Sequence, residues 1–159
     1  MPNDLLGFLH LASAFGALAF GLLVLLLRKG TPLHRQIGYG YVAAMAIVNV
    51  TALMIYDLFG GFGPFHLAAL ISLVTLVGGI VPARRRPPPR GWLPWHAYWM
   101  SWSYVGLLAA LVAETATRML EFPFGLTAGT ASLIVFVLGA VGIGVLVPAA
   151  LGRTARGGG

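Results

Sequence analysis

The chain has 159 residues, of which 58% are hydrophobic and only 9% are charged. A soluble domain carries about 25% charged residues, so this composition excludes a soluble domain and indicates a membrane protein. The net charge is +6 and cysteine is absent, which excludes disulfides, thiolate metal ligands and covalently attached c-type haem.

Five apolar runs approach or exceed the roughly 20 residues that a transmembrane helix needs. They cover about residues 5–27, 36–58, 65–82, 93–116 and 125–151. We therefore predict an all-α, polytopic membrane protein with five transmembrane helices, in which an up-down four-helix core carries one peripheral helix. The predicted organisation is a single transmembrane domain over residues 1–152 and a cytoplasmic tail over residues 153–159.

The first two runs are joined by a short loop. The first run begins behind an acidic residue, Asp4, and its apolar stretch is longer than that of a cleavable signal peptide. We therefore expect it to remain as a membrane helix. The loop ends in Thr31 and Pro32, an N-cap residue followed by a residue favoured at the first helical position. The second run is thus predicted to be a capped helix.

The fourth run carries all four tryptophans, from Trp92 to Trp102. Interfacial aromatic belts explain Trp92 and Trp95. Trp99 and Trp102 lie about 10 Å and 15 Å beyond Trp92 at 1.5 Å per residue, too deep for such a belt. We expect these two indoles to pack against a flat neighbour or to face lipid.

The cations lie on one side of the predicted topology. Only Arg118 falls on the other side, and the remaining cations occupy the first loop, the third loop and the tail: Arg28, Lys29, Arg35, Arg84, Arg85, Arg86, Arg90, Arg153 and Arg156. This distribution follows the positive-inside rule and does not suit a nucleic-acid surface. It predicts a bacterial inner-membrane protein with its N-terminus outside, its C-terminus in the cytoplasm, and a third loop held at anionic lipid headgroups.

Three of the four histidines share one local pattern. A proline lies two residues before each of His34, His66 and His96, and each of these prolines lies at or near the start of an apolar run. Because proline is favoured at the first position of a helix, each of these histidines is predicted in a first helical turn. The fourth, His10, lies near the start of the first run. Ionisable groups in membrane spans are rare and usually functional.

The predicted topology sorts the histidines into two pairs on alternate spans. His10 and His66 form an outer pair, and His34 and His96 form an inner pair flanked by the basic loops. Alternate helices of an up-down bundle face each other across the core, so each pair could hold a flat ring between two axial ligands. We predict one or two haem b groups with bis-histidine ligation, and electron transfer between a cytoplasmic or quinone-level donor and an outer acceptor.

Two other classes of function remain open. A non-haem metal site at the outer surface would use His10, His66, Asp57 and Glu114 as ligands for zinc, copper or iron. Glu114 follows His96 by five helical turns and therefore shares its side of the helix. The third class is a cofactor-free accessory or transport protein, with a proton or solute pathway through the histidines, Glu114 and Asn49.

Residues 28–35, 61–66 and 102–106 resemble a family of small bacterial membrane proteins known as domain of unknown function 2306. The resemblance covers most of the first four spans and implies a membrane protein with no established activity. The four-histidine layout is also similar to that of the transmembrane two-haem b-type cytochromes, which pass electrons across membranes. That similarity implies an outer haem on the outer pair and an inner haem on the inner pair, although those cytochromes place their ligands deeper in the helices.

Overall fold

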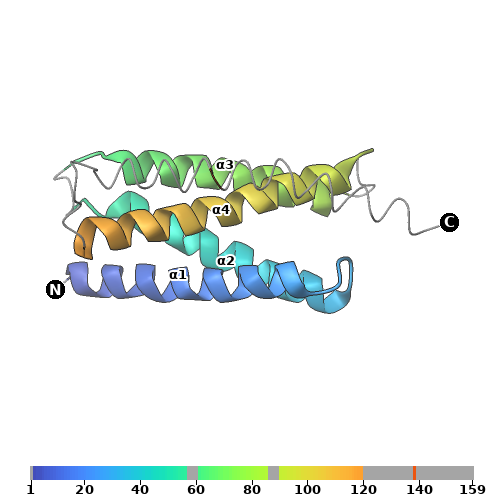
Figure 1. Ribbon diagram of the computed structural model, residues 1–159, viewed down its shortest axis with the longest axis horizontal. Coiled ribbons are helices and arrows are strands. Elements are labelled where there is room, and N and C mark those ends of the chain that lie inside the picture. The colour runs from blue at the N-terminus through green and yellow to red at the C-terminus, as the bar shows by residue number, and fades with distance from the viewer. Residues whose placement is uncertain (1, 57–60, 86–89, 120–137, 139–159) are drawn as a thin grey trace. The chain divides into compact units, whose positions relative to one another are not determined.

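The computed structural model describes residues 2–56, 61–85, 90–119 and 138. The regular structure of this part of the chain is helical throughout (Figure 1). Its helices are α1 (Pro2–Leu26), α2 (Pro32–Met54), α3 (Pro64–Arg84) and α4 (Trp92–Met119). The predicted all-α class is confirmed. The fifth predicted span, residues 125–151, lies outside the described residues except for residue 138.

Three of the described helices are long and apolar enough to cross a membrane: Leu5–Leu26, Pro32–Met54 and Phe65–Arg84. The fourth, α4, has 28 residues and is long enough by length alone. Its first half is rich in tryptophan, tyrosine and serine, which lowers its hydropathy below that of the other three. Three spans are thus supported by length and composition, and the two predicted over residues 93–116 and 125–151 stay predictions.

The chain divides into two compact units, Met1–Leu76 and Val77–Gly159. In the first unit, α1 and α2 pack along each other as an antiparallel hairpin (Figure 1). Small residues allow the approach: a Cβ at Gly40 would lie 3.3 Å from the Phe20 ring, and Ala17 is fully buried. Small residues at helix contacts are typical of membrane helices, which gain little from the hydrophobic effect when they associate in lipid.

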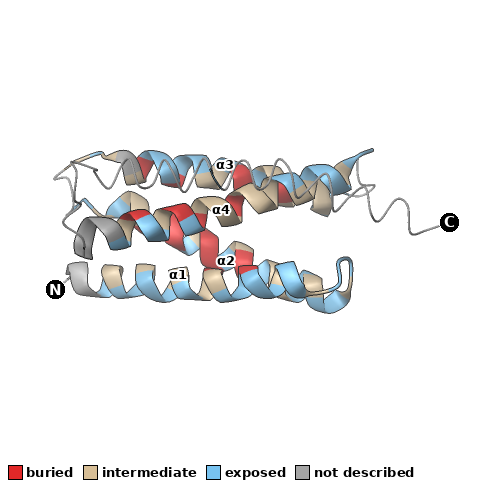
Figure 2. Cartoon of the chain, in the orientation of Figure 1, coloured by how far each residue is buried: buried red, intermediate tan, exposed pale blue. Residues whose placement is uncertain are grey.

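Most of the α1 surface is exposed (Figure 2). The exposed side chains include large apolar ones such as Leu5, Phe8 and Phe15. In water a surface of this kind would mark an interaction site, whereas lipid tails solvate it directly. The exposure of α1 therefore agrees with a membrane helix.

In the second unit, the last turns of α3 contact the first half of α4. A Cβ at Gly79 would lie 2.5 Å from the Met100 sulfur, and a Cβ at Gly78 would lie 3.1 Å from the Trp99 ring. Two adjacent glycines thus bring the two helix backbones close together. The Trp99 indole packs on the flat glycine surface, which is one of the two arrangements expected for this deep tryptophan.

The prolines mark the helix starts as predicted in two of three cases. Helix α2 begins at Pro32, and the Thr31 side chain accepts a hydrogen bond of 3.1 Å from the His34 main-chain N–H. Helix α3 begins at Pro64. Helix α4 begins at Trp92, two residues before Pro94, so the prediction that His96 lies in a first helical turn was wrong. A first-turn N–H has no intrahelical acceptor, and proline is therefore tolerated there.

Two glycine-to-alanine changes test the contact between α3 and α4. Gly79→Ala must displace Met100, so we expect it to lower the free energy of unfolding by about 1–3 kcal/mol. Gly106→Ala is the matched control in α4, because a Cβ there meets nothing within 4 Å. It should leave stability unchanged or raise it by up to about 1 kcal/mol. Denaturation of the detergent-solubilised variants measures both changes in unfolding free energy. Equal changes in the two variants would contradict the close approach of α3 and α4 at Gly79.

Candidate functional site

His96 lies in the second turn of α4 and is held by the main chain of α3. Its Nδ1 atom is 2.7 Å from the carbonyl oxygen of Gly79. A carbonyl can only accept, so Nδ1 donates its hydrogen in this contact. The neutral ring then carries its lone pair on Nε2, which is the nitrogen available to a metal or to a haem iron.

The local sequence explains why the Gly79 carbonyl is accessible to a neighbouring helix. Pro82 lies inside α3 and has no N–H, but the carbonyl that loses its usual donor is that of Gly78, the residue before Gly79. The accessibility of the Gly79 carbonyl therefore rests on the two glycines. The absence of side chains at Gly78 and Gly79 then lets the His96 imidazole reach the α3 backbone.

His10 uses the same ring nitrogen in a hydrogen bond to α2. Its Nδ1 atom lies 2.8 Å from Thr51 Oγ1. The Thr51 hydroxyl is itself 2.7 Å from the Ile47 carbonyl, which requires the hydroxyl proton. Thr51 Oγ1 therefore accepts from His10, whose Nδ1 carries the ring proton. The resulting tautomer is the same as that of His96.

His66 has the opposite tautomer. The Gly63 main-chain N–H donates to its Nδ1 atom at 3.1 Å, so the proton of the neutral ring lies on Nε2. The side chain is buried, with the Tyr56 and Phe62 rings 4.6 Å and 5.0 Å from its centroid. Its Nε2 is buried and has no hydrogen-bond partner among the described residues. Coordination by His66 would require this arrangement to change.

His34 lies in the first turn of α2, where Thr31 caps its main-chain N–H. Its side chain is half-buried and its Nδ1 atom is buried. One turn further on, a Cβ at Gly38 would meet nothing within 4 Å. The space beside Gly38, one turn after this histidine, is therefore open.

Of the four residues of the alternative metal site, the structure describes His10, His66 and Glu114. Within the residues that the structure describes, no three histidine, cysteine, aspartate or glutamate side chains form a group that could hold a metal ion. Glu114 is half-buried in α4, and Asp57 lies outside the described residues. The predicted set of His10, His66, Asp57 and Glu114 therefore stays a prediction.

Sequence reasoning missed the two groups that orient the histidines. Thr51 is one of several threonines in apolar runs, and nothing in the local pattern links it to His10, which is 41 positions away. The Gly79 carbonyl belongs to the main chain, but a signal for it exists in hindsight: a Gly-Gly pair three residues before a proline inside a membrane helix.

Comparison with known proteins settles the family. A family model described as "Predicted membrane protein (DUF2306)" matches residues 7–151. The chain belongs to this family. The match covers the four described helices almost completely and confirms both the predicted family resemblance and the assignment as a membrane protein. No curated protein and no solved structure matches the chain.

Removal of the Thr51 hydroxyl tests the hydrogen bond between α1 and α2 in this family member. Thr51→Val keeps the side-chain shape but leaves the His10 N–H without its acceptor, so we expect a loss of about 1–3 kcal/mol in unfolding free energy. Thr75→Val is the matched control, because the buried Thr75 hydroxyl donates to the Ser72 carbonyl of its own helix. Chemical denaturation measures both variants, and equal losses of unfolding free energy would contradict the hydrogen bond between His10 and Thr51.

The tautomers can be read directly by ¹⁵N NMR of the histidine-labelled protein in detergent above pH 8. We expect the proton on Nδ1 for His10 and His96 and on Nε2 for His66, because the hydrogen-bond partners differ. Each resonance pair is assigned by its loss in a His→Gln variant. A His66 ring protonated on Nδ1, or a His96 ring protonated on Nε2, would contradict the geometry.

Proposed function

We propose that the protein is a haem-b-binding integral membrane protein with a transmembrane electron-transfer role and bis-histidine ligation. The observation that carries the proposal is the hydrogen bond of 2.7 Å from His96 Nδ1 to the Gly79 carbonyl. Histidines that bind metals usually donate their other ring N–H to a carbonyl or carboxylate, which fixes the tautomer and the ring orientation. His96 has this environment before any cofactor is considered.

The second axial ligand of the primary site is His34. This pairing is taken from the predicted topology, in which both histidines begin helices on the basic side of the chain. The open space at Gly38 supports a bulky planar group beside His34. Arg35 in the first turn of α2 and Arg90 just before α4 would complement the charge of haem propionates.

A second haem would use His10 and His66. The His10 tautomer favours ligation through Nε2, as for His96. The His66 tautomer does not, because its Nδ1 accepts from Gly63 and its Nε2 keeps the proton. Ligation by His66 would need the turn around Gly63 to release the ring. We therefore assign the primary haem to the inner pair.

In this proposal the chain orients the two axial ligands. The Gly79 carbonyl holds the His96 ring, and the Thr31 cap fixes the backbone of His34. A bis-histidine haem b exchanges single electrons between its ferric and ferrous states. With the N-terminus outside in a bacterial inner membrane, a cytoplasmic or quinone-level donor would be oxidised and an outer acceptor reduced.

Haem content of purified variants tests the proposal. His34→Ala and His96→Ala should each abolish the low-spin Soret and α bands of the inner haem, since each removes an axial ligand. Added imidazole should restore the spectrum of His96→Gly, which a structural role of the ring would not allow. His66→Ala should lower the haem content only if two haems bind.

Two further variants distinguish haem binding from the competing metal site. Asp57→Ala and Glu114→Ala should leave the haem spectrum unchanged, and elemental analysis should show no metal loss in either variant. A protein that binds zinc, copper or iron in proportion to the chain, and loses it in these two variants but not in His34→Ala, would contradict haem binding and favour the outer metal site. A His96→Ala protein with an unchanged haem spectrum would also contradict the proposal.

A further inference from the structure

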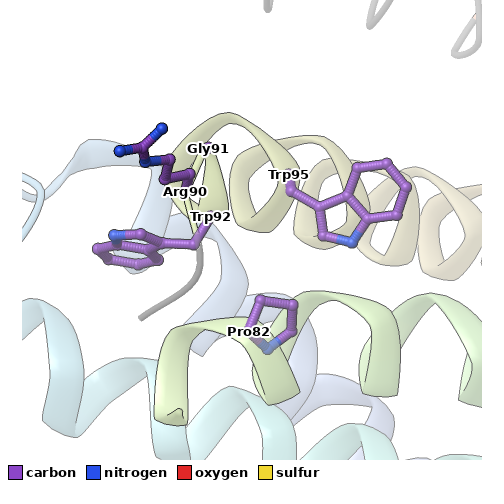
Figure 3. A pocket seen from close by; sticks show the side chains of 5 residues that line it. All are labelled: Pro82, Arg90, Gly91, Trp92 and Trp95. Atoms are coloured by element: carbon purple, nitrogen blue, oxygen red, sulfur yellow. The ribbon is translucent and has the colours of Figure 1, made fainter. Parts of the chain in front are cut away.

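A shallow pocket of about 240 Å³ lies where α3 ends and α4 begins, lined by Pro82, Arg90, Gly91, Trp92 and Trp95. Figure 3 shows Arg90 and Trp92 on one side of it, Trp95 on the other, and the Pro82 ring between them at its base. We propose that this pocket binds the phosphate headgroup of an anionic phospholipid. The proposal does not depend on haem binding.

The pocket lies at the depth of lipid headgroups. The third candidate membrane span runs from Phe65 to Arg84, so Pro82 is within two residues of its end. Trp92 is the first residue of the next helix. Tryptophans at such positions sit at the level of the headgroups, with one edge in the apolar region and one in the polar region.

The charge around the pocket is positive. The Arg90 side chain is exposed at the pocket, and Arg84 and Arg85 are exposed at the end of α3. The sequence has no aspartate or glutamate from residue 58 to residue 113. A guanidinium matches the geometry of phosphate oxygens and can bind two of them at once. Basic pockets at the ends of membrane helices bind anionic lipid headgroups in this way.

The pocket walls favour a lipid over free phosphate. The Trp95 side chain is 53% exposed although it is a large apolar group, and the Pro82 ring adds a second apolar surface. Gly91, at φ +70°, turns the chain from Arg90 into α4 and so places the cation beside these walls. A lipid would contact the arginine with its phosphate and the walls with its glycerol and first methylenes. Inorganic phosphate would gain only the contact to Arg90.

Native mass spectrometry of the detergent-purified full chain, titrated with phosphatidylglycerol or phosphatidylcholine, tests the inference. We expect preferential retention of phosphatidylglycerol. Arg90→Gln should reduce that retention about fivefold, as expected for one arginine near a membrane surface. Arg28→Gln is the matched control, since Arg28 is an exposed arginine of another loop and should retain the lipid.

A second pair of variants tests the apolar wall. Trp95→Leu should weaken phosphatidylglycerol retention, whereas Tyr98→Leu, at an exposed aromatic outside the pocket, should not. Equal losses in Arg90→Gln and Arg28→Gln would overturn the proposal in favour of diffuse charge attraction. Displacement of the lipid by excess sodium phosphate, together with normal retention in Trp95→Leu, would overturn it in favour of a free-phosphate site.

Discussion

The hydrogen bond between His96 and the Gly79 carbonyl is the constraint on which the functional interpretation depends. It exists because two features of the sequence coincide: two glycines in α3 that let α4 approach, and a histidine in α4 that lies beside them. Each feature alone is common in membrane helices. Together they fix an imidazole with its proton on Nδ1 and its lone pair on Nε2, the tautomer that ligation of a metal through Nε2 requires.

The same physical argument separates the histidines from one another. In lipid a buried polar atom must find its partner inside the protein, so the partner decides the chemistry of the ring. A carbonyl or an accepting hydroxyl selects a proton on Nδ1, as at His96 and His10. A main-chain N–H selects a lone pair on Nδ1, as at His66. Four histidines that look equivalent in the sequence therefore differ in their readiness to bind a metal.

Much of the local structure could be predicted from the sequence, because it depends on neighbouring residues. The Thr31 cap and the starts of α2 and α3 follow from local turn chemistry. Helix α2 starts at Pro32 rather than at residue 36, because the cap rather than hydropathy sets the boundary. The tautomers could not be predicted, since they depend on Thr51 and Gly79, which are distant in sequence from the histidines that they bind. The number of spans predicted from the sequence depends on hydropathy, and by that criterion α4 is not among the three candidate spans.

The most direct test of the central claim is the absorbance spectrum of the wild-type protein purified from membranes, oxidised and then reduced with dithionite, with haem quantified per chain. Haem binding by His96 and His34 predicts a six-coordinate, low-spin b-type spectrum in both states and at least one haem per chain. A protein that is colourless, and stays colourless after haem is supplied during expression, would contradict the assignment of His96 as an axial ligand.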